Sequence, residues 1–309
     1  MSDVQIKKHI DQGLVVQESG HRKITDDIHL IQQCVVMDDV GDLDLREHMD
    51  WYEPEREKHN QQKTYLIDDE DTLLYDNLMP VGTDIILNGL EDVLGDGQLD
   101  YVVISHPEAN HAGNTHEVLE KYPEATLVMP GSGAHHDLFG IKDIDEERVM
   151  FVSEGDMLDL GKHTIEFVEG LFVDHAVTAW MYERTTETLF VADFMGNEHM
   201  DGECLKYADE MTVTDTQRQR HAGLVFTWLR FADPDAVDAV IDDLIDRFAP
   251  EMIALAHGQV VRKDGIGELE KMKTVVGNII EREERDGNYD VHTHQMLRYP
   301  GRAESEVGF

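Results

Sequence analysis

The chain has 309 residues, and 41% of them are hydrophobic, which is enough to bury a sizeable core in one large domain or two small ones. Sixty-five acidic residues against 26 lysines and arginines give a formal net charge of −39, spread along the chain. A field of this sign repels phosphate groups, so we expect neither nucleic acid nor an anionic membrane as a partner. So acidic a surface favours a salt-rich, halophilic cytoplasm, where ions screen the self-repulsion.

The cysteine content is low and gives no local motif. Cys34 and Cys204 lie far apart and form no C-x-x-C pair, which predicts neither a disulfide framework nor a zinc finger and fits a reducing cytoplasm. The N-terminus lacks the apolar region of a signal peptide, and no apolar run approaches the roughly 18 residues of a membrane span. We therefore expect a soluble cytoplasmic protein.

The first half of the chain is predicted to contain strands and then helices that alternate with strands. Weak alternation over residues 1–45 predicts edge strands, with Ile28–Met37 the best candidate, and the polar segment 46–62, with Pro54 inside it, predicts a loop or a broken helix. The pattern further predicts a hairpin of 64–68 with 72–76, a helix over 85–94, a strand over 101–104, a helix over 114–122 and a strand over 125–129.

The second half repeats this mixture. It predicts strands within 149–168, a hairpin of 177–182 with 188–192, a partly irregular segment 197–222, a helix over 235–248, a strand over 252–256 and a charged helix over 267–285. No linker composition interrupts the chain, so we expect one α/β domain over residues 1–309, built from two packed sheets flanked by helices.

Residues able to bind metals follow three of these strands. A polar loop with two histidines is usually only a solvated loop, but three strands that each end in such residues are hard to explain by packing alone. Strand ends are common locations of sites in α/β proteins, and mixed imidazole and carboxylate ligands suit iron, zinc or manganese. The residues are His106, Glu108, Asn110 and His111 after the strand 101–104, Asp193 after 188–192, and His257 after 252–256.

The spacing His106-x-Glu108-x-Asn110-His111 resembles the first metal motif of the metallo-β-lactamase fold. Most hydrolases of that fold have H-x-H-x-D-H, whereas a glutamate at the second position resembles the flavodiiron proteins, with H-x-E-x-D-H. The resemblance covers about residues 64–258 and leaves 259–309 as a C-terminal helix and tail. It implies a metallo-β-lactamase-like αββα sandwich with a diiron site.

The resemblance also implies a ligand set. His106 and Glu108 would bind one iron, His111 and His257 the second, and Asp193 would bridge the two. Asn110 stands where the family has an aspartate, so it offers a neutral oxygen in place of a charged ligand.

The family's remaining histidine falls at Asp174 or His175. Adjacent residues of a strand point to opposite faces, so a loop or bulge must decide between them. We favour His175, with Asp174 as the alternative.

Other residues receive secondary roles. Candidates for an outer shell or distal pocket are His48, Tyr52, His199 and Tyr207. Histidines expected at the surface are His135, His136, His163, His221, His292 and His294.

The resemblance predicts a non-heme diiron protein that binds dioxygen. It would act as an oxygen sensor, or would reduce O2 or NO if a separate flavoprotein supplied electrons, because residues 258–309 are too few for the family's flavodoxin domain, and no flavin is expected on this chain. A signalling partner and a homodimer follow from the resemblance only. The alternative is a zinc-dependent hydrolase, which Asn110 and Glu108 disfavour.

Overall fold

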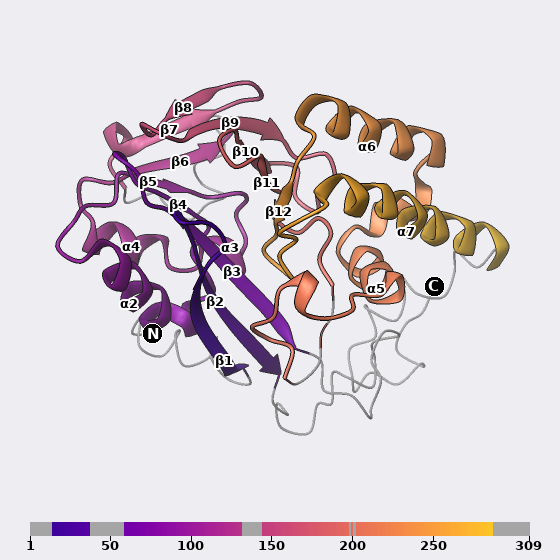
Figure 1. Ribbon diagram of the computed structural model, residues 1–309, viewed down its shortest axis with the longest axis horizontal. Coiled ribbons are helices and arrows are strands. Elements are labelled where there is room, and N and C mark those ends of the chain that lie inside the picture. The colour runs from indigo at the N-terminus through magenta and orange to yellow at the C-terminus, as the bar shows by residue number, and fades with distance from the viewer. Residues whose placement is uncertain (1–13, 38–58, 132–143, 198, 200–201, 287–309) are drawn as a thin grey trace, which may run out of the picture.

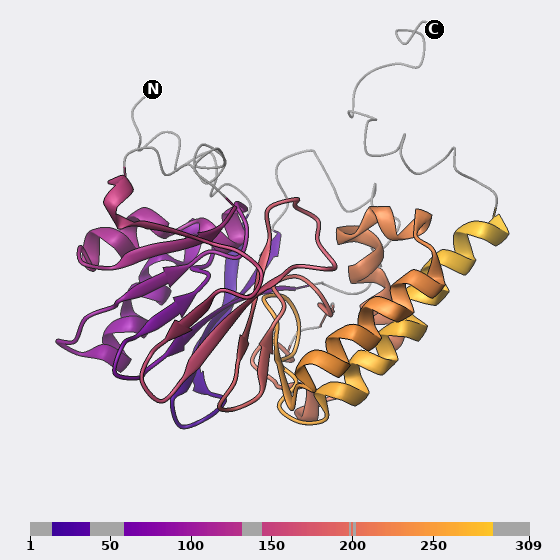
Figure 2. The same cartoon turned by 90° about the horizontal axis from the view of Figure 1, so that it is seen from above.

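The computed structural model describes residues 14–37, 59–131, 144–197, 199 and 202–286. Two β-sheets pack face to face, and helices cover the outer face of each sheet (Figure 1, Figure 2). This confirms the predicted metallo-β-lactamase-like αββα fold. The predictions for His48, Tyr52, His135, His136, His292 and His294 lie outside the described residues.

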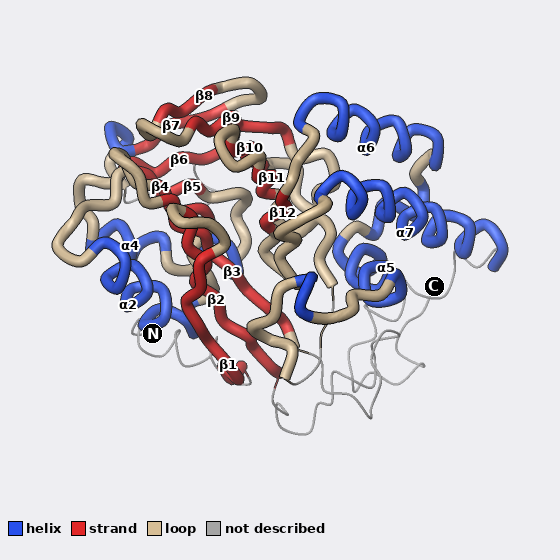
Figure 3. Tube along the Cα trace, viewed as in Figure 1, coloured by secondary structure: helices blue, strands red, loops and turns tan. Residues whose placement is uncertain are grey.

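The first sheet has seven strands in chain order, seen in Figure 3 beside α2 and α4. Its first four strands pair antiparallel, and β4 to β7 run parallel. The strands are β1 (Leu14–Lys23), β2 (Ile28–Met37), β3 (Asn60–Ile67), β4 (Leu73–Tyr75), β5 (Tyr101–Val103), β6 (Thr126–Pro130) and β7 (Val149–Val152).

The second sheet has five strands in the order β12-β11-β10-β9-β8. Its strands pair antiparallel except β11 and β12, which are parallel. They are β8 (Met157–Asp159), β9 (Thr164–Glu169), β10 (Ala179–Glu183), β11 (Thr188–Phe190) and β12 (Met252–Ala254).

The helices fall into two groups on opposite sides of the sandwich (Figure 2). The first group is α2 (Thr83–Leu94), α3 (Ala109–Ala112) and α4 (Thr115–Lys121), and the second is α5 (Asp215–Val225), α6 (Pro234–Phe248) and α7 (Gly265–Asp286). Short 3-10 helices are η2 (Pro80–Gly82), η4 (Glu146–Arg148), η5 (Ala208–Glu210) and η6 (Thr227–Phe231).

Strand alternation builds the layers. Successive side chains of a strand point to opposite faces, so on β4 Leu73 and Tyr75 enter the core between the sheets while Leu74 packs against α2 and α4. On β10, Met181 points between the sheets and Trp180 packs toward α6 and α7. The apolar runs of these strands are therefore buried on both faces.

One expectation was wrong. The polar residues from Asn60 onward belong to β3, where Gln61, Gln62 and Lys63 are buried, so the strand begins earlier than the expected residue 64. The segment 197–222 is partly irregular, as expected, and its end contains most of α5, whose start is capped by Thr214 and Gln217 in a reciprocal pair of side-chain bonds. Apolar periodicity is too weak in both segments to reveal them.

Within the described ranges, no helix has both the length and the apolar character needed to cross a bilayer. The carboxyl ends of β4 and β5 in one sheet, and of β11 and β12 in the other, bring their following loops together. These loops carry the candidate ligands.

Candidate metal centre

Three segments of the chain supply a buried cluster of three histidines and one carboxylate. His106 follows β5, His111 lies on α3, Asp193 follows β11 and His257 follows β12. All four are buried, with Asp193 only 4% exposed. Residues far apart in the sequence are thus gathered at the strand ends, as predicted.

Asp193 lies at the centre of the cluster, and its two oxygens face different histidines. Oδ2 is 3.2 Å from His106 Nε2. Oδ1 is 3.2 Å from His111 Nε2 and 3.0 Å from His257 Nε2. One carboxylate therefore joins two separate groups of ligand atoms.

The outer nitrogens of two histidines are fixed by hydrogen bonds. His111 Nδ1 donates to Asp76 Oδ2 at 2.7 Å, and His257 Nδ1 donates to the carbonyl oxygen of Gln61 at 2.5 Å. With the proton on Nδ1, the lone pair of each neutral ring lies on Nε2, the atom that faces Asp193. This arrangement is typical of metal-binding histidines.

Asp76 was not anticipated. It is fully buried directly after β4, with φ of 60°, and it accepts hydrogen bonds from the backbone and hydroxyl of Ser105 as well as from His111. A carboxylate tolerates this left-handed backbone better than most residues do. The signal was present in the sequence: an acid directly follows an apolar strand, as Asp193 does.

The side of the cluster around His106 carries two further carboxylates. Asp174 Oδ1 is 3.9 Å and Glu108 Oε2 is 4.0 Å from His106 Nε2. The Glu108 side chain is 45% exposed, so this side of the cluster opens to solvent.

The loop between β9 and β10 distinguishes Asp174 from His175. The Asp174 carboxylate comes together with His106 and Asp193 in one potential ligand group. His175 joins none of the groups found among the described residues; its Nδ1 accepts the backbone N–H of Val177 at 3.1 Å, and its ring centroid lies 6.4 Å from that of His106. The geometry therefore favours Asp174, which was the alternative, over His175.

Asn110 lies at the second group of ligand atoms, beside His257. Its side-chain nitrogen is 2.8 Å from His257 Nε2. Rotating the amide by half a turn would present the oxygen Oδ1 to the same space. The residue is thus placed at the second ligand group but brings no charge to it.

Charges in the cluster respond strongly to burial and to one another. Burial alone would raise the pKa of Asp193, but His111 and His106 hold it well below its usual range. Burial likewise opposes a charge on His111, but Asp193 and Asp76 raise its pKa well above the ordinary value. Burial, with His111 nearby, lowers the pKa of His106. The cluster therefore favours a positive charge beside Asp193.

The residues present fit a metal pair. His106 Nε2, His111 Nε2 and Asp193 Oδ1 are buried and lack a conventional hydrogen-bond partner. An imidazole lone pair and a carboxylate oxygen repel each other at about 3 Å unless a cation or proton lies between them. Unpartnered ligand atoms that face one another are what a bound cation would satisfy.

Two histidines that were expected at the surface, His221 and His163, pack against buried residues instead. His221 on α5 places Nε2 3.0 Å from the backbone oxygen of Asp193 and packs on Gly196, where a Cβ would come within 2.1 Å of that nitrogen. His163 is fully buried and contacts Glu183 and Asp27. Neither position has a strand-end signal, so sequence reasoning missed both.

The described candidates for an outer shell lie away from these ligands. The Tyr207 ring packs between the guanidinium groups of Arg22 and Arg262, and its hydroxyl donates to the carbonyl oxygen of Lys23. His199 contacts Cys34. The contacts of Tyr207 and His199 are therefore with residues outside the candidate metal centre.

Comparison with known proteins agrees with this geometry. No family model matches the chain. It is 33% identical over 145 residues to a putative diflavin flavoprotein of Nostoc, a match covering 45% of this chain and 24% of that protein. It is 28% identical over 205 residues to the rubredoxin-oxygen oxidoreductase of Megalodesulfovibrio gigas, covering 64% of this chain and 48% of the relative. A third relative is the anaerobic nitric oxide reductase flavorubredoxin of Salmonella arizonae, at 25% identity over 201 residues, 64% of this chain and 41% of that protein.

Solved structures show the same fold. The rubredoxin oxygen oxidoreductase of Desulfovibrio gigas superposes with a TM-score of 0.66 at 21% identity, covering 86% of this chain and 62% of that one. The sequence relatives are flavodiiron proteins, and the chain has the metallo-β-lactamase-like fold of their core. It matches less than half the length of each of these three relatives.

Proposed function

We propose that this chain is a non-heme diiron protein that binds dioxygen and reduces it when a separate donor supplies electrons. The observation that carries the proposal is the position of Asp193, whose two oxygens face His106 on one side and His111 with His257 on the other. A carboxylate that faces two ligand groups is placed to bridge two metal ions.

In this proposal His106, Asp174 and Glu108 hold one iron, and His111 and His257 hold the other, with Asp193 between them. Asn110 contributes at most a neutral amide to the second position, and His175 is not a ligand. The ligand set is nitrogen and oxygen only, which suits iron. The comparisons give no support to the zinc hydrolase alternative.

The protein's own residues prepare the site before any metal arrives. Asp76 and the Gln61 carbonyl hold the protons of His111 and His257 on Nδ1, which keeps both Nε2 atoms free to bind. The burial of Asp193 and the histidines excludes water from the centre, while the exposed Glu108 leaves one side open to a small gas molecule. A reduced iron pair held by these residues would supply the electrons that dioxygen chemistry needs.

Electron supply is proposed to come from a partner. Two relatives are named for rubredoxin-oxygen and nitric oxide reduction, which supports O2 and NO as ligands and a rubredoxin-type or flavoprotein donor. Without a donor the protein would act as an oxygen sensor. A homodimer, a cytoplasmic location and a salt-rich source belong to the same proposal.

The test is metal analysis of protein purified without oxygen in high salt, followed by optical spectra before and after air is admitted. Two irons per chain and a visible band that develops with O2 are expected. Persistence of that band without a reductase supports sensing, and its decay with consumption of an added reductant supports reduction. Protein that binds no iron, or whose spectrum does not respond to air, would overturn the proposal.

A further inference from the structure

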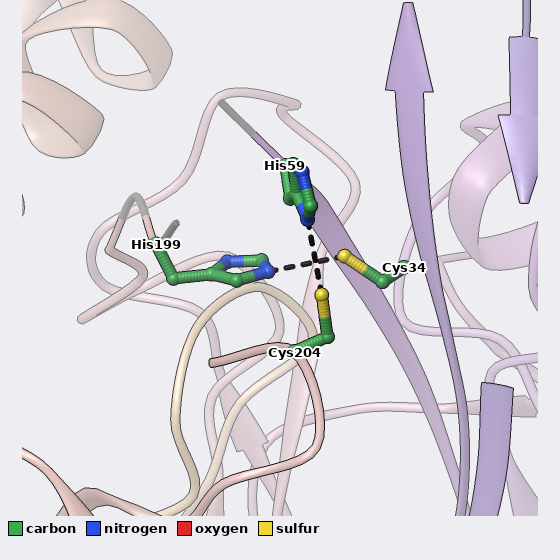
Figure 4. A group of neighbouring side chains, drawn as sticks. All are labelled: Cys34, His59, His199 and Cys204. Atoms are coloured by element: carbon green, nitrogen blue, oxygen red, sulfur yellow. Dashed lines mark hydrogen bonds between the residues drawn. The ribbon is translucent and has the colours of Figure 1, made fainter. Parts of the chain in front are cut away.

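Four side chains form a second cluster, apart from the ligands already described (Figure 4). Cys34 lies on β2, His59 directly precedes β3, and both His199 and Cys204 lie in the loop that follows Asp193. All four are buried, none more than 4% exposed. This set, Cys34, His59, His199 and Cys204, is called the Cys2His2 cluster below.

The donor atoms of the cluster point at one another. Cys34 Sγ is 3.1 Å from His199 Nε2, and His59 Nδ1 is 3.0 Å from Cys204 Sγ. All four donor atoms lie within 4.8 Å of one another. Figure 4 shows the two contacts crossing, so that the four donor atoms surround one point.

Backbone pairing brings the two histidines of the cluster together. His59 and His199 form an isolated antiparallel bridge, with the His59 N–H donating to the His199 carbonyl at 3.4 Å. Their rings meet edge to face at 5.5 Å. The loop after Asp193 is therefore laid against the start of β3, opposite the cysteine of β2.

One feature of the cluster favours a metal over a pair of weak hydrogen bonds. A thiol is a poor hydrogen-bonding group, yet both cysteine sulfurs of the chain are directed at imidazole nitrogens. Cysteine sulfur and imidazole nitrogen are, in contrast, good ligands for a metal ion such as zinc.

The geometry and the donor types select zinc. With Zn–S near 2.3 Å and Zn–N near 2.0 Å, neighbouring donors of a tetrahedral site lie about 3.6 Å apart, so the observed contacts would open by only about half an ångström. Two sulfurs and two nitrogens around one point are typical of zinc, and four protein ligands leave no open position for catalysis.

We propose that Cys34, His59, His199 and Cys204 form a structural zinc site that fastens the loop after Asp193 to strands β2 and β3.

The site would also support the diiron centre through Gln61. The Gln61 side chain donates to the Cys204 carbonyl, while its own carbonyl accepts the proton of His257. Lys63, two residues along β3, donates to the carbonyl of Gly258 next to His257. One edge of β3 thus contacts both clusters, and zinc would hold it in place.

The first experiment measures metals in the full chain purified without chelators. One tightly held zinc per chain is expected beside any iron. Cys204→Ser should lower zinc about ten-fold and lower Tm by about 5–10 °C, because a structural zinc contributes directly to folding stability. His163→Gln, which removes another fully buried histidine, is the matched control and should keep its zinc.

A second experiment needs no variant, in case Cys204→Ser fails to fold. Wild-type protein titrated with a mercurial should release one zinc as its two thiols react. Cobalt exchanged into the chain should show thiolate-to-cobalt charge transfer and tetrahedral visible bands. Absence of zinc from protein supplied with it, a Cys34–Cys204 disulfide found by mass spectrometry, or iron in this cluster would each overturn the proposal.

Failure here is separable from failure of the diiron proposal. Asp193→Asn should lose iron and keep zinc, whereas Cys204→Ser should lose zinc first. Zinc bound by a chain that takes up no iron would sink only the diiron proposal, and iron without zinc would sink only this one.

Discussion

The candidate diiron centre and the Cys2His2 cluster are built on different plans. The first is mixed imidazole and carboxylate, gathered from strand ends, and it opens to solvent at Glu108. The second has sulfur and nitrogen donors only, and all four residues are buried. A ligand set that is open to solvent suits a metal centre that binds a substrate. A closed set with thiolates suits a metal ion that stabilises the fold. Under the two proposals, the loop after Asp193 would connect a reactive metal site to a structural one.

The largest expected effect comes from Asp193→Asn. Loss of the shared carboxylate should weaken iron binding more than about 100-fold, beyond the 10–100-fold typical of residues behind the ligands. Iron content and the oxygen-dependent spectrum measure this. Asp209→Asn, at an exposed pair with Arg262, is the control and should keep its iron. If Asp193→Asn retained two irons, the bridging role would be wrong.

Asp76→Asn should weaken iron binding about 10–100-fold without touching a ligand. Asparagine tolerates the positive φ but cannot offer the charged acceptor that holds His111. Competition with a chelator of known affinity gives the ratio to wild type. Zinc content should not change, and a parallel loss of zinc would indicate general damage to the fold.

Asp174→Ala and His175→Ala should separate the two residues of the β9–β10 loop. Loss of Asp174 should cost about ten-fold in iron affinity on the side of His106, the low end of what metal-site residues contribute. Loss of His175 should change it little, because its Nδ1 is occupied by the Val177 N–H. The opposite order would restore His175 as the ligand.

The smallest effect is kinetic. Dialysis against a chelator should remove iron before zinc, because Glu108 opens one cluster to solvent while the other is buried. Metal content followed over time records the order. Zinc leaving first would contradict the division into an open and a closed site.

Sequence alone predicted most of the fold and the central residues that gather at the strand ends. The His106 to His111 motif is local, and the apolar strands ahead of Asp193 and His257 mark where those side chains must lie. The Asp174–His175 choice depended on a loop, where the alternation of strand residues no longer applies. Asp76 carried the same strand-end signal as Asp193 and was passed over.

The Cys2His2 cluster could not be predicted in this way. Its residues come from β2, from the start of β3 and from two points of one loop, with no repeated spacing. Cys34 and Cys204 lie far apart in sequence, which argued against a zinc finger, and only the packing of the loop on β3 brings them together. His221 was missed for the same reason. That residues 1–309 form one domain stays a prediction.

The split of both clusters between the two halves of the chain has a consequence for biosynthesis. Each cluster draws ligands from an early segment and from a late one, so neither can be complete while the first sheet alone has emerged from the ribosome. The Cys2His2 set is complete once Cys204 has been made, whereas the iron ligands must wait for His257 at the end of β12. A chain folding as it is synthesised could therefore assemble the Cys2His2 cluster before the iron ligands are all present.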